Sequence, residues 1–421
     1  MKCYSITPSD LLFFRDGRPM ETGEGSGGHG ARWPFPTVFF DAIHAALHRA
    51  FPERSGIQEW EAPHKARGSN GRQGQLRFGS LRTLGPFPRR SDGGWLFPAP
   101  LDARQGGDGA LHALRPSEVS AGTSNLPKPL TGVPLSNQPP SKEASPLWWT
   151  AEQLSRYMEN GSLPADAKMI TSPLWKVEWT TGIGTDPGRD TQDGSRIFSA
   201  SYLRLCSDVS LGCASHLPSA GMEDALQALF PESGHIVCGG QQRVCSVEKE
   251  GTSLAETLPR STPPGSSRVK WTLISPAIFP KSSGHPGGWL PSWVNPETGQ
   301  VILPKEKPDR MPGETRVAWR RRWNKVAPLD VRLVAACVGK PEIVTGWSDF
   351  LRGPDGTPGT GKSTRLAVPA GSTYYFEGKD APLLGALLAW DGAGPDTPQS
   401  RSGALGEKGL GLGVTGPWQP F

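Results

Sequence analysis

The sequence lacks the features that mark export, membrane insertion and the commonest hydrolases. Residues 1–6 contain no apolar signal run, and no stretch approaches the roughly 18 apolar residues of a membrane-spanning helix. There is no Gly-x-Ser-x-Gly elbow, no His-Glu-x-x-His pair and no acidic cluster suited to metal-assisted hydrolysis. Cysteine is scarce, with six residues in 421, and without an export signal these thiols indicate a reducing compartment. We therefore expect a cytoplasmic protein.

Apolar residues are also few. Hydrophobic residues make up 36% of the chain, whereas glycine (53) and proline (43) are abundant. This composition favours small domains with long loop-rich segments over one large core. Lysine and arginine (45) exceed aspartate and glutamate (40), which gives a formal net charge of +5. Such a mild excess permits nucleic-acid binding without requiring it.

The most unusual motif is a glycine-rich stretch near the C-terminus, residues 403–413. It holds five glycines, alternates them with Leu410 and Leu412, and carries Lys408. Glycine reaches positive φ at little cost, so successive N–H groups can turn toward one anion, most often a phosphate. The pattern matches neither the dinucleotide fingerprint nor the nucleotide P-loop. Taken alone, the stretch would more simply be a flexible tail.

A second candidate anion site lies near the N-terminus. Arg15 and Arg18 flank a tight Asp16-Gly17 turn beside a wholly apolar run. Two arginines on a rigid turn suit bidentate contacts to phosphate. The alternative is that one or both arginines pair with Asp10 or Asp16.

One stretch imitates an ATP-binding motif. Residues 356–364 satisfy Gly-x-x-x-x-Gly-Lys-Ser/Thr, and residues 387–391 could pass as a Walker B strand. A P-loop, however, must follow a buried strand and open a helix. No apolar run precedes this motif, and Pro369 allows barely one helical turn after Lys362. We therefore do not expect an ATPase.

Other patterns leave their alternatives open. Four cysteines and two nearby histidines could chelate zinc if their strands were neighbours: Cys206, Cys213, His216, His235, Cys238 and Cys245. Their spacing, however, is not Cys-x₂-Cys. Free cysteines are also commonly buried as small hydrophobic residues. We expect neither a metal nor another cofactor. His44 and His48 stand four apart on a predicted helix without a third ligand. Residues 316–325 interleave basic and aromatic side chains, which suits single-stranded nucleic acid but equally a solvated charged face.

The arrangement of periodic segments predicts an α+β fold. A strand at 2–8, a helix at 222–230 and a strand pair at 235–238 and 243–247 fit the strand and helix order of a ferredoxin-like domain. Residues 174–195 suggest a projecting hairpin. A polar linker at 249–267 precedes a second unit, and Ile274-Ser-Pro faintly echoes Ile6-Thr-Pro. Residues 102–145 are rich in Gly, Pro and Ser and indicate a surface insertion, and residues 280–328 are again loop-rich.

Residues 8–19, Pro-Ser-Asp-Leu-Leu-Phe-Phe-Arg-Asp-Gly-Arg-Pro, closely resemble the opening of the third Cmr subunit of type III-B CRISPR effectors, a RAMP-superfamily protein related to the Cas-five group. The resemblance continues in order along most of the chain, at 33–37, 85–87, 96–102, 181–186, 197–204, 239–240, 368–377 and 406–413. Two positions depart from the family pattern. Gly409 and Leu410 follow Glu-Lys where the family commonly has arginine, and Gln241 stands where an acidic residue often follows the glycine pair.

The resemblance implies two tandem ferredoxin-like (RRM-like) RAMP domains, 1–255 and 266–421, with 102–145, much of 280–328 and 352–363 as insertions. They would form a non-catalytic subunit that holds the 5′ repeat-derived tag of the guide RNA. This subunit would also dock the large polymerase-like subunit and the first backbone subunit. The glycine-rich stretch would be the RNA cradle, and the hairpin would lie near RNA or a neighbouring subunit. The residues expected to contact RNA are Arg15, Arg18, Ile183, Asp186, Arg189, Gly406, Lys408, Gly409, Gly411 and Gly413.

Two alternatives remain at this stage. Related RAMP proteins cleave precursor RNA, so the chain could be a guide-processing endoribonuclease with His44 or His48 as general base. It could also be a scaffold that binds only proteins. The sequence gives neither the tag sequence nor the residues that contact neighbouring subunits.

Overall fold

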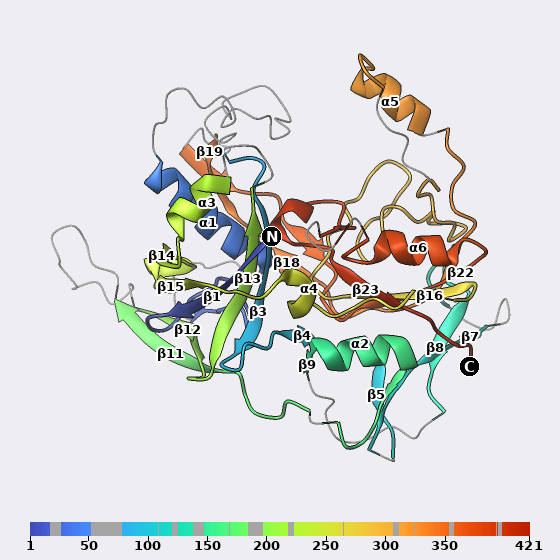
Figure 1. Cartoon of the computed structure of the whole chain (residues 1–421), viewed down its shortest axis with the longest axis horizontal. Helices are drawn as coiled ribbons and strands as arrows, with labels where there is room; N and C mark the ends of the chain where they lie inside the picture. The colour runs from blue at the N-terminus through green and yellow to red at the C-terminus, as the bar shows by residue number, and fades with distance from the viewer. Residues whose placement is uncertain are drawn as a thin grey trace.

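The protein has a mixed α and β architecture, in which antiparallel sheets predominate and helices are few and short (Figure 1). None of the helices in the described part of the chain has the length and apolarity needed to cross a membrane. The computed structural model describes the chain except for residues 17–26, 52–77, 108, 120–124, 138–146, 168, 184–196, 218–222, 264, 306–310, 324, 353–357, 393 and 395–397.

The N-terminal half is built on a five-stranded antiparallel sheet with the order β14-β15-β1-β13-β3. Its strands are β1 (Lys2–Pro8), β3 (Arg82–Arg90), β13 (Val209–His216), β14 (Ser233–Val237) and β15 (Val244–Lys249). Tyr4 of β1 pairs with Cys213 and Ile6 with Val247, so the first strand lies in the centre. The predicted strand at 2–8 and the predicted β14–β15 pair are confirmed.

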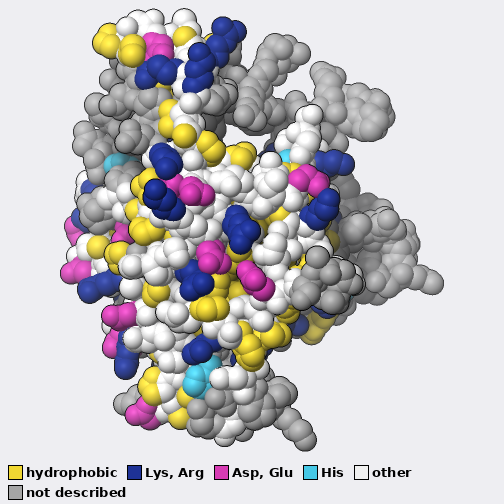
Figure 2. Space-filling model, turned by 90° about the vertical axis from the view of Figure 1, so that its right-hand side faces the viewer, with side chains coloured by type: hydrophobic (Ala, Val, Ile, Leu, Met, Phe, Trp, Pro, Cys, Tyr) yellow, Lys and Arg dark blue, Asp and Glu magenta, His cyan; other side chains and the backbone are white. Residues whose placement is uncertain are grey.

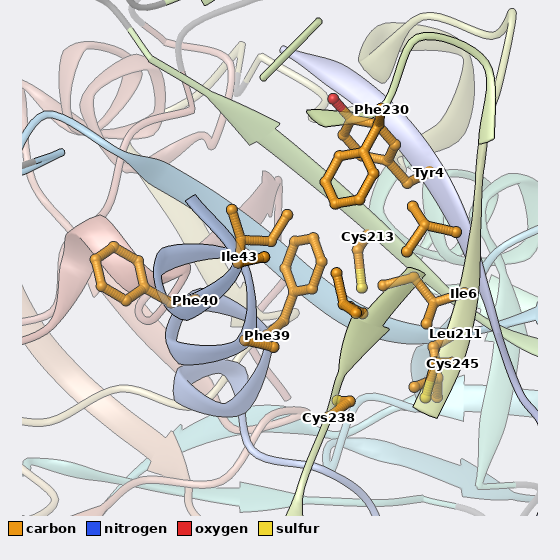
Figure 3. Packing of buried hydrophobic residues seen from close by; sticks show 14 of the residues in the cluster. Tyr4, Ile6, Phe39, Phe40, Ile43, Leu211, Cys213, Phe230, Cys238 and Cys245 are labelled. Atoms are coloured by element: carbon orange, nitrogen blue, oxygen red, sulfur yellow. The ribbon is translucent and has the colours of Figure 1, made fainter. Parts of the chain in front are cut away.

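Two helices complete this core, α1 (Pro36–Ala50) and α3 (Glu223–Leu229). Phe39 and Ile43 of α1 point toward Ile6 and the strands beyond it, whereas Phe40 points to the opposite side of the helix (Figure 3). The predicted helix at 222–230 is therefore confirmed as α3. The cysteines of this core, Cys213, Cys238 and Cys245, are buried among aliphatic and aromatic side chains.

The C-terminal half is built on a four-stranded antiparallel sheet with the order β17-β22-β16-β23. Its strands are β16 (Arg268–Leu273), β17 (Arg332–Cys337), β22 (Thr373–Glu377) and β23 (Gly413–Gly416), and α6 (Ala381–Leu388) packs beside β16 and β23. Trp271, Trp293 and Phe376 pack in its core. Trp293 belongs to the loop-rich segment 280–328, so part of that segment contributes to the core.

The remaining elements are short pairs and connecting helices. The hairpin β11 (Trp175–Ile183) and β12 (Ile197–Leu205) is antiparallel, as predicted, and β2 (Gly27–Gly28) runs parallel to β12. The other strands are β4 (Leu96–Pro98), β5 (Ala103–Gln105), β6 (Leu111–Ala113), β7 (Arg115–Glu118), β8 (Gly132–Leu135), β9 (Trp148–Thr150), β10 (Ser162–Leu163), β18 (Glu342–Val344), β19 (Trp347–Arg352), β20 (Pro358–Gly361) and β21 (Arg365–Ala367). The other helices are α2 (Ala151–Asn160), α4 (Leu254–Thr257), α5 (Arg316–Trp323), η4 (Gly240–Gln242) and η5 (Gly406–Lys408).

The predicted surface insertion at 102–145 is wrong for its described residues. They form β5 to β8, Asp102 is fully buried, and the Thr131 N–H donates to the Val334 carbonyl of β17 at 3.0 Å. The predicted linker at 249–267 is also packed, since Leu254 and Leu258 are buried. Both segments join a hydrophobic cluster that the two halves share.

Candidate nucleic-acid interface at the domain junction

A cavity of about 650 Å³ lies between the two halves of the chain. Its walls come from residues 31–38 ahead of and within α1, from β3, β9 and β11, and from two C-terminal segments, 274–276 and 342–345. The volume falls within the roughly 300–1,000 Å³ range of small-molecule sites. The junction therefore offers a hollow large enough to hold part of a nucleotide chain.

Three tryptophans from distant segments meet in this cavity. The ring centroids of Trp33 and Trp175 are 5.1 Å apart, those of Trp33 and Trp148 5.8 Å, and those of Trp148 and Trp175 6.0 Å. The Trp33 indole N–H donates to the Pro86 carbonyl at 2.8 Å, which fixes the ring against β3. All three side chains are only partly buried. Exposed indole faces in a concave wall are platforms on which nucleobases stack.

Two arginines stand at the same cavity, Arg15 and Arg32. Arg15 forms an isolated antiparallel β-bridge with Gly30, and next to it the Ala31 N–H donates to the Phe14 carbonyl at 2.6 Å. Gly30 can approach the hairpin because it has no side chain: its N–H donates to Ser201 Oγ at 2.7 Å. Arg15 and Arg32 are both exposed to solvent. Arg15 is therefore placed beside the aromatic platform.

An acidic residue also lines the cavity. Glu342 belongs to β18, and part of its surface is open to solvent. Neighbouring atoms that displace water raise the pKa of its carboxyl group above the ordinary value. A carboxyl group with a raised pKa repels a nearby phosphate less, because it takes up a proton more readily.

The glycine-rich stretch adopts a different structure from the open cradle expected from its sequence. Gly409 and Gly411 do have positive φ, +85° and +73°. Their amides are already bonded, however: the Gly409 N–H donates to Gly406 O at 3.1 Å and the Gly411 N–H to Pro276 O at 2.7 Å. Gly413 begins β23 and pairs with Leu273. The prediction of free amides at Gly409 and Gly411 is therefore wrong.

Close packing explains these glycines. A Cβ atom on Gly409 would lie 2.8 Å from Thr83 O and 3.0 Å from Leu84 Cα of β3. Gly406 lies against Ser400, and the alternating Leu410 and Leu412 are buried. The stretch thus wedges the C-terminal half against β3, next to the Pro86 wall of the cavity.

Lys408 is bound within the protein. Its ammonium lies 2.6 Å from Asp41 Oδ1 and 4.3 Å from the centroid of the Phe40 ring, both on α1. Phe40 lies on the side of α1 opposite to Phe39, at the edge of the core cluster (Figure 3). Lys408 therefore ties the glycine-rich stretch to the N-terminal half.

Lys408→Ala should lower the free energy of unfolding by about 1 kcal/mol, because it removes an ion pair whose carboxylate is largely exposed and a cation–π contact. Chemical denaturation measures the loss, and Asp41→Asn serves as the control that keeps the cation over the ring. The salt slope of RNA binding should fall by less than the roughly 0.7 expected for one phosphate contact, since Asp41 already balances this charge. A full decrease of that size would show that Lys408 leaves Asp41 for RNA.

The sequence model of the family described as "CRISPR-associated protein (Cas_Cmr3)" matches residues 4–418. The chain belongs to this family. The resemblance seen in the sequence is confirmed, and this Cmr3-family chain is a subunit of a Cmr-type CRISPR effector. No curated protein matches it in sequence.

Comparison with solved structures also gave matches. A chain of "Cryo-EM structure of the Type III-B Cmr-beta bound to cognate target RNA" is 14% identical, with 89% of this chain and 86% of that chain covered and a TM-score of 0.42. A chain of "Crystal structure of Csm3-Csm4 subcomplex in the type III-A CRISPR-Cas interference complex" is 10% identical, with 90% and 95% covered and a TM-score of 0.32. The assignment of this chain to the family rests on the sequence model that matches residues 4–418.

Of the other residues predicted to contact RNA in this Cmr3-family chain, only some lie in the described part of the structure. Ile183 ends β11 and pairs with Ile197 of β12. Arg18, Asp186 and Arg189 lie outside the described residues. The structure thus brings Arg15 to the junction cavity and the glycine-rich stretch to its neighbouring wall. Contact of all these residues with RNA stays a prediction.

The motif at residues 356–364, which matches the P-loop pattern in sequence, does not form a P-loop in the structure. Lys362 stands between β20 and β21, where a P-loop lysine would open a helix, and Leu387 belongs to α6 rather than to a strand. Among the described residues, no group of three or more His, Cys, Asp or Glu side chains is arranged to hold a metal ion. The zinc alternative thus finds no support in the packing of Cys213, Cys238 and Cys245.

Sequence reasoning missed the aromatic platform. Trp33 belongs to one of the family motifs, residues 33–37, whereas neither Trp148 nor Trp175 belongs to a motif. Arg32 was also missed. The available signal was weak: Trp148 belongs to a Trp-Trp pair beside a Gly-, Pro- and Ser-rich segment, and Trp175 begins the predicted hairpin.

Proposed function

We propose that this Cmr3-family chain is a non-catalytic, cytoplasmic RNA-binding subunit of a type III-B CRISPR effector. It holds the 5′ repeat-derived tag of the guide RNA and docks the large polymerase-like subunit and the first backbone subunit. The observation that carries the proposal is the junction cavity, which combines three partly exposed indoles with two exposed arginines.

The chemistry of this cavity suits an unpaired RNA strand. Unstacked bases are recognised by stacking on aromatic side chains, and the guanidinium group binds phosphate through a fork of N–H donors. Trp148 and Trp175 would receive bases, and Arg15 and Arg32 would contact the backbone beside them. The tag would lie between the two sheets, with the glycine-rich stretch forming one wall.

The topology supports a tandem ferredoxin-like arrangement with domains at 1–255 and 266–421. In each sheet the first strand lies between the third and the last, and the second strand is at the edge beside the third. This order applies to β1, β3, β13 and β15 in the first sheet and to β16, β17, β22 and β23 in the second. In the second unit, the irregular segment that contains Trp293 stands where the first helix of such a domain would be.

We assign the docking of a neighbouring subunit to the hairpin β11–β12. Val177 and Trp179 are 54% and 59% exposed and share the face of β11 that begins with Trp175 in the cavity. This apolar face leads away from the RNA site. Exposed apolar side chains of this size in one row are typical of an interaction surface.

The chain is proposed to perform no bond cleavage. His44 and His48 face each other at 4.5 Å between ring centroids and pack against Phe78, and neither lines the cavity. A general base must reach the 2′-hydroxyl within hydrogen-bond distance. Metal-free cleavage of repeat RNA that disappears in His44→Ala would favour the endoribonuclease instead.

Trp148→Ala should weaken binding of tag-bearing RNA by about 5- to 150-fold, which corresponds to roughly 1–3 kcal/mol for one stacked base. Arg15→Ala should also reduce the salt slope by about 0.7. Fluorescence anisotropy of labelled tag RNA with the full chain, at several salt concentrations, measures both effects. Trp179→Ala is the matched control, because it removes an exposed indole outside the cavity.

Two outcomes would contradict the proposal. Absence of binding of the unaltered chain to tag-bearing RNA would indicate a scaffold that binds only proteins. Equal losses in Trp148→Ala and Trp179→Ala would place the RNA outside the junction cavity.

A further inference from the structure

The helix α5 projects from the C-terminal half of the molecule (Figure 1). Val317 is 61% exposed and Met311, just before the helix, is 57% exposed. Side chains that would normally attach a helix to a core thus face solvent here.

Charge is concentrated on this projection. Residues 314–325 carry four arginines, one lysine and one glutamate, a net charge of +4, whereas the whole chain has +5. The remaining residues are therefore close to neutral, at +1. Dark blue side chains gather at the projecting upper end of the molecule (Figure 2). The mild basicity of the protein is thus a local property of this helix.

The single carboxylate of the segment is already used. Glu314 accepts two hydrogen bonds from Arg322, at 3.2 and 2.9 Å, and the Thr315 hydroxyl accepts from the Ala318 N–H at 3.2 Å to cap the first turn. This arrangement fixes the start of the helix and neutralises Arg322. Residues 314–325 contain no second carboxylate.

The helix is poorly suited to stand alone. Its eight residues are fewer than the roughly 12–15 at which isolated helices become marginally stable. Arg316 and Arg320 are four apart, and like charges at that spacing repel each other along a helix face. An anionic partner removes this repulsion.

We propose that α5 is an RNA-backbone-binding arm, separate from the junction cavity. Its arginines bind phosphates of a single strand, and the interleaved Trp319 and Trp323, also four apart, offer rings to the bases. This pairing of cations with indoles favours RNA over an acidic protein surface. The arm contacts the backbone without reading the tag, so its function extends beyond the proposed tag site and does not depend on it.

The test uses the full chain and a labelled RNA of mixed sequence that lacks the tag. The variant Arg316→Gln, Arg320→Gln, Arg321→Gln keeps the Arg322–Glu314 pair and replaces arginine with another good helix former. At low salt its affinity should fall at least about tenfold, and the salt slope should fall by about 2, since each phosphate contact to a single strand contributes roughly 0.7.

The matched control removes three exposed cations elsewhere, Arg115→Gln, Arg260→Gln and Lys281→Gln. It should keep most of the affinity and slope. Equal losses in both triple variants, or no loss in the α5 variant, would overturn the proposal. Binding of the unaltered chain to polyglutamate but not to the RNA would also overturn it, in favour of an acidic protein partner. Trp148→Ala should leave tag-free binding unchanged, so failure of the arm and failure of the tag site are distinguishable.

Discussion

Asp102→Ala should lower the free energy of unfolding by about 3–5 kcal/mol, because it leaves a buried ammonium without its counter-ion. Asp102 is 0% exposed and Lys270 1% exposed, and Asp102 Oδ2 lies 3.2 Å from Lys270 Nζ. The same oxygen accepts the Tyr375 hydroxyl hydrogen at 2.9 Å. Lys270 also lies 4.1 Å from the Tyr157 ring centroid, so apolar and aromatic surroundings replace water around the charge.

Urea denaturation of the full chain measures this loss. The double variant Asp102→Leu, Lys270→Met removes both charges and should cost less than the single one, because no unpaired buried charge remains. Lys128→Ala provides a matched exposed pair: Lys128 and Glu297 are 75% and 68% exposed, and breaking their contact should cost at most about 1 kcal/mol. A cost for Asp102→Ala as small as that of Lys128→Ala would contradict this account.

The Asp102–Lys270 pair shows what local sequence patterns could not reveal. Asp102 opens a stretch whose Gly, Pro and Ser content predicts a surface insertion, yet it bonds a strand residue 168 positions later. Composition describes how a segment behaves by itself. It does not indicate that a distant half of the chain supplies a buried counter-ion.

Features that depend on nearby residues were predicted well. The strand at 2–8, the helix α3, the pair β14–β15 and the hairpin β11–β12 follow from apolar periodicity and turn residues within a few positions. The same reasoning excluded the P-loop, because Pro369 prevents a helix after Lys362. The resemblance to a family supplied the identity, since its motifs are spread along the chain in order.

The sequence predicted only some of the residues of the candidate site. The sequence singled out Arg15 as a phosphate contact, and this residue lines the junction cavity. It did not show that Trp33 meets Trp148 and Trp175 there, from a segment more than a hundred residues away. The glycine-rich stretch misled for a physical reason. Glycine serves both to expose amides to a ligand and to let two backbones approach, and only the packing partner distinguishes these uses. Burial of Leu410 and Leu412 was the signal for the second use.

Gly409→Ala should be the second most damaging substitution, and it separates those two uses. A non-glycine residue at φ +85° costs about 1–2 kcal/mol in backbone energy. The added methyl group would meet backbone atoms of Thr83 and Leu84, which cannot rotate away, and overpacking of this kind costs roughly 1–3 kcal/mol more. We therefore expect a loss of folding free energy larger than the backbone term alone, measured by urea denaturation.

Gly288→Ala isolates the backbone term, because Gly288 has φ +71° but no atom within 4 Å of its would-be Cβ. The difference between the two variants measures the contact between the glycine-rich stretch and β3. Because β3 also carries the Pro86 carbonyl that holds Trp33, Gly409→Ala should weaken tag-RNA binding even in the fraction that remains folded. Equal stability losses in Gly409→Ala and Gly288→Ala would mean that the stretch does not press on β3, and the glycines would again be free to serve a ligand.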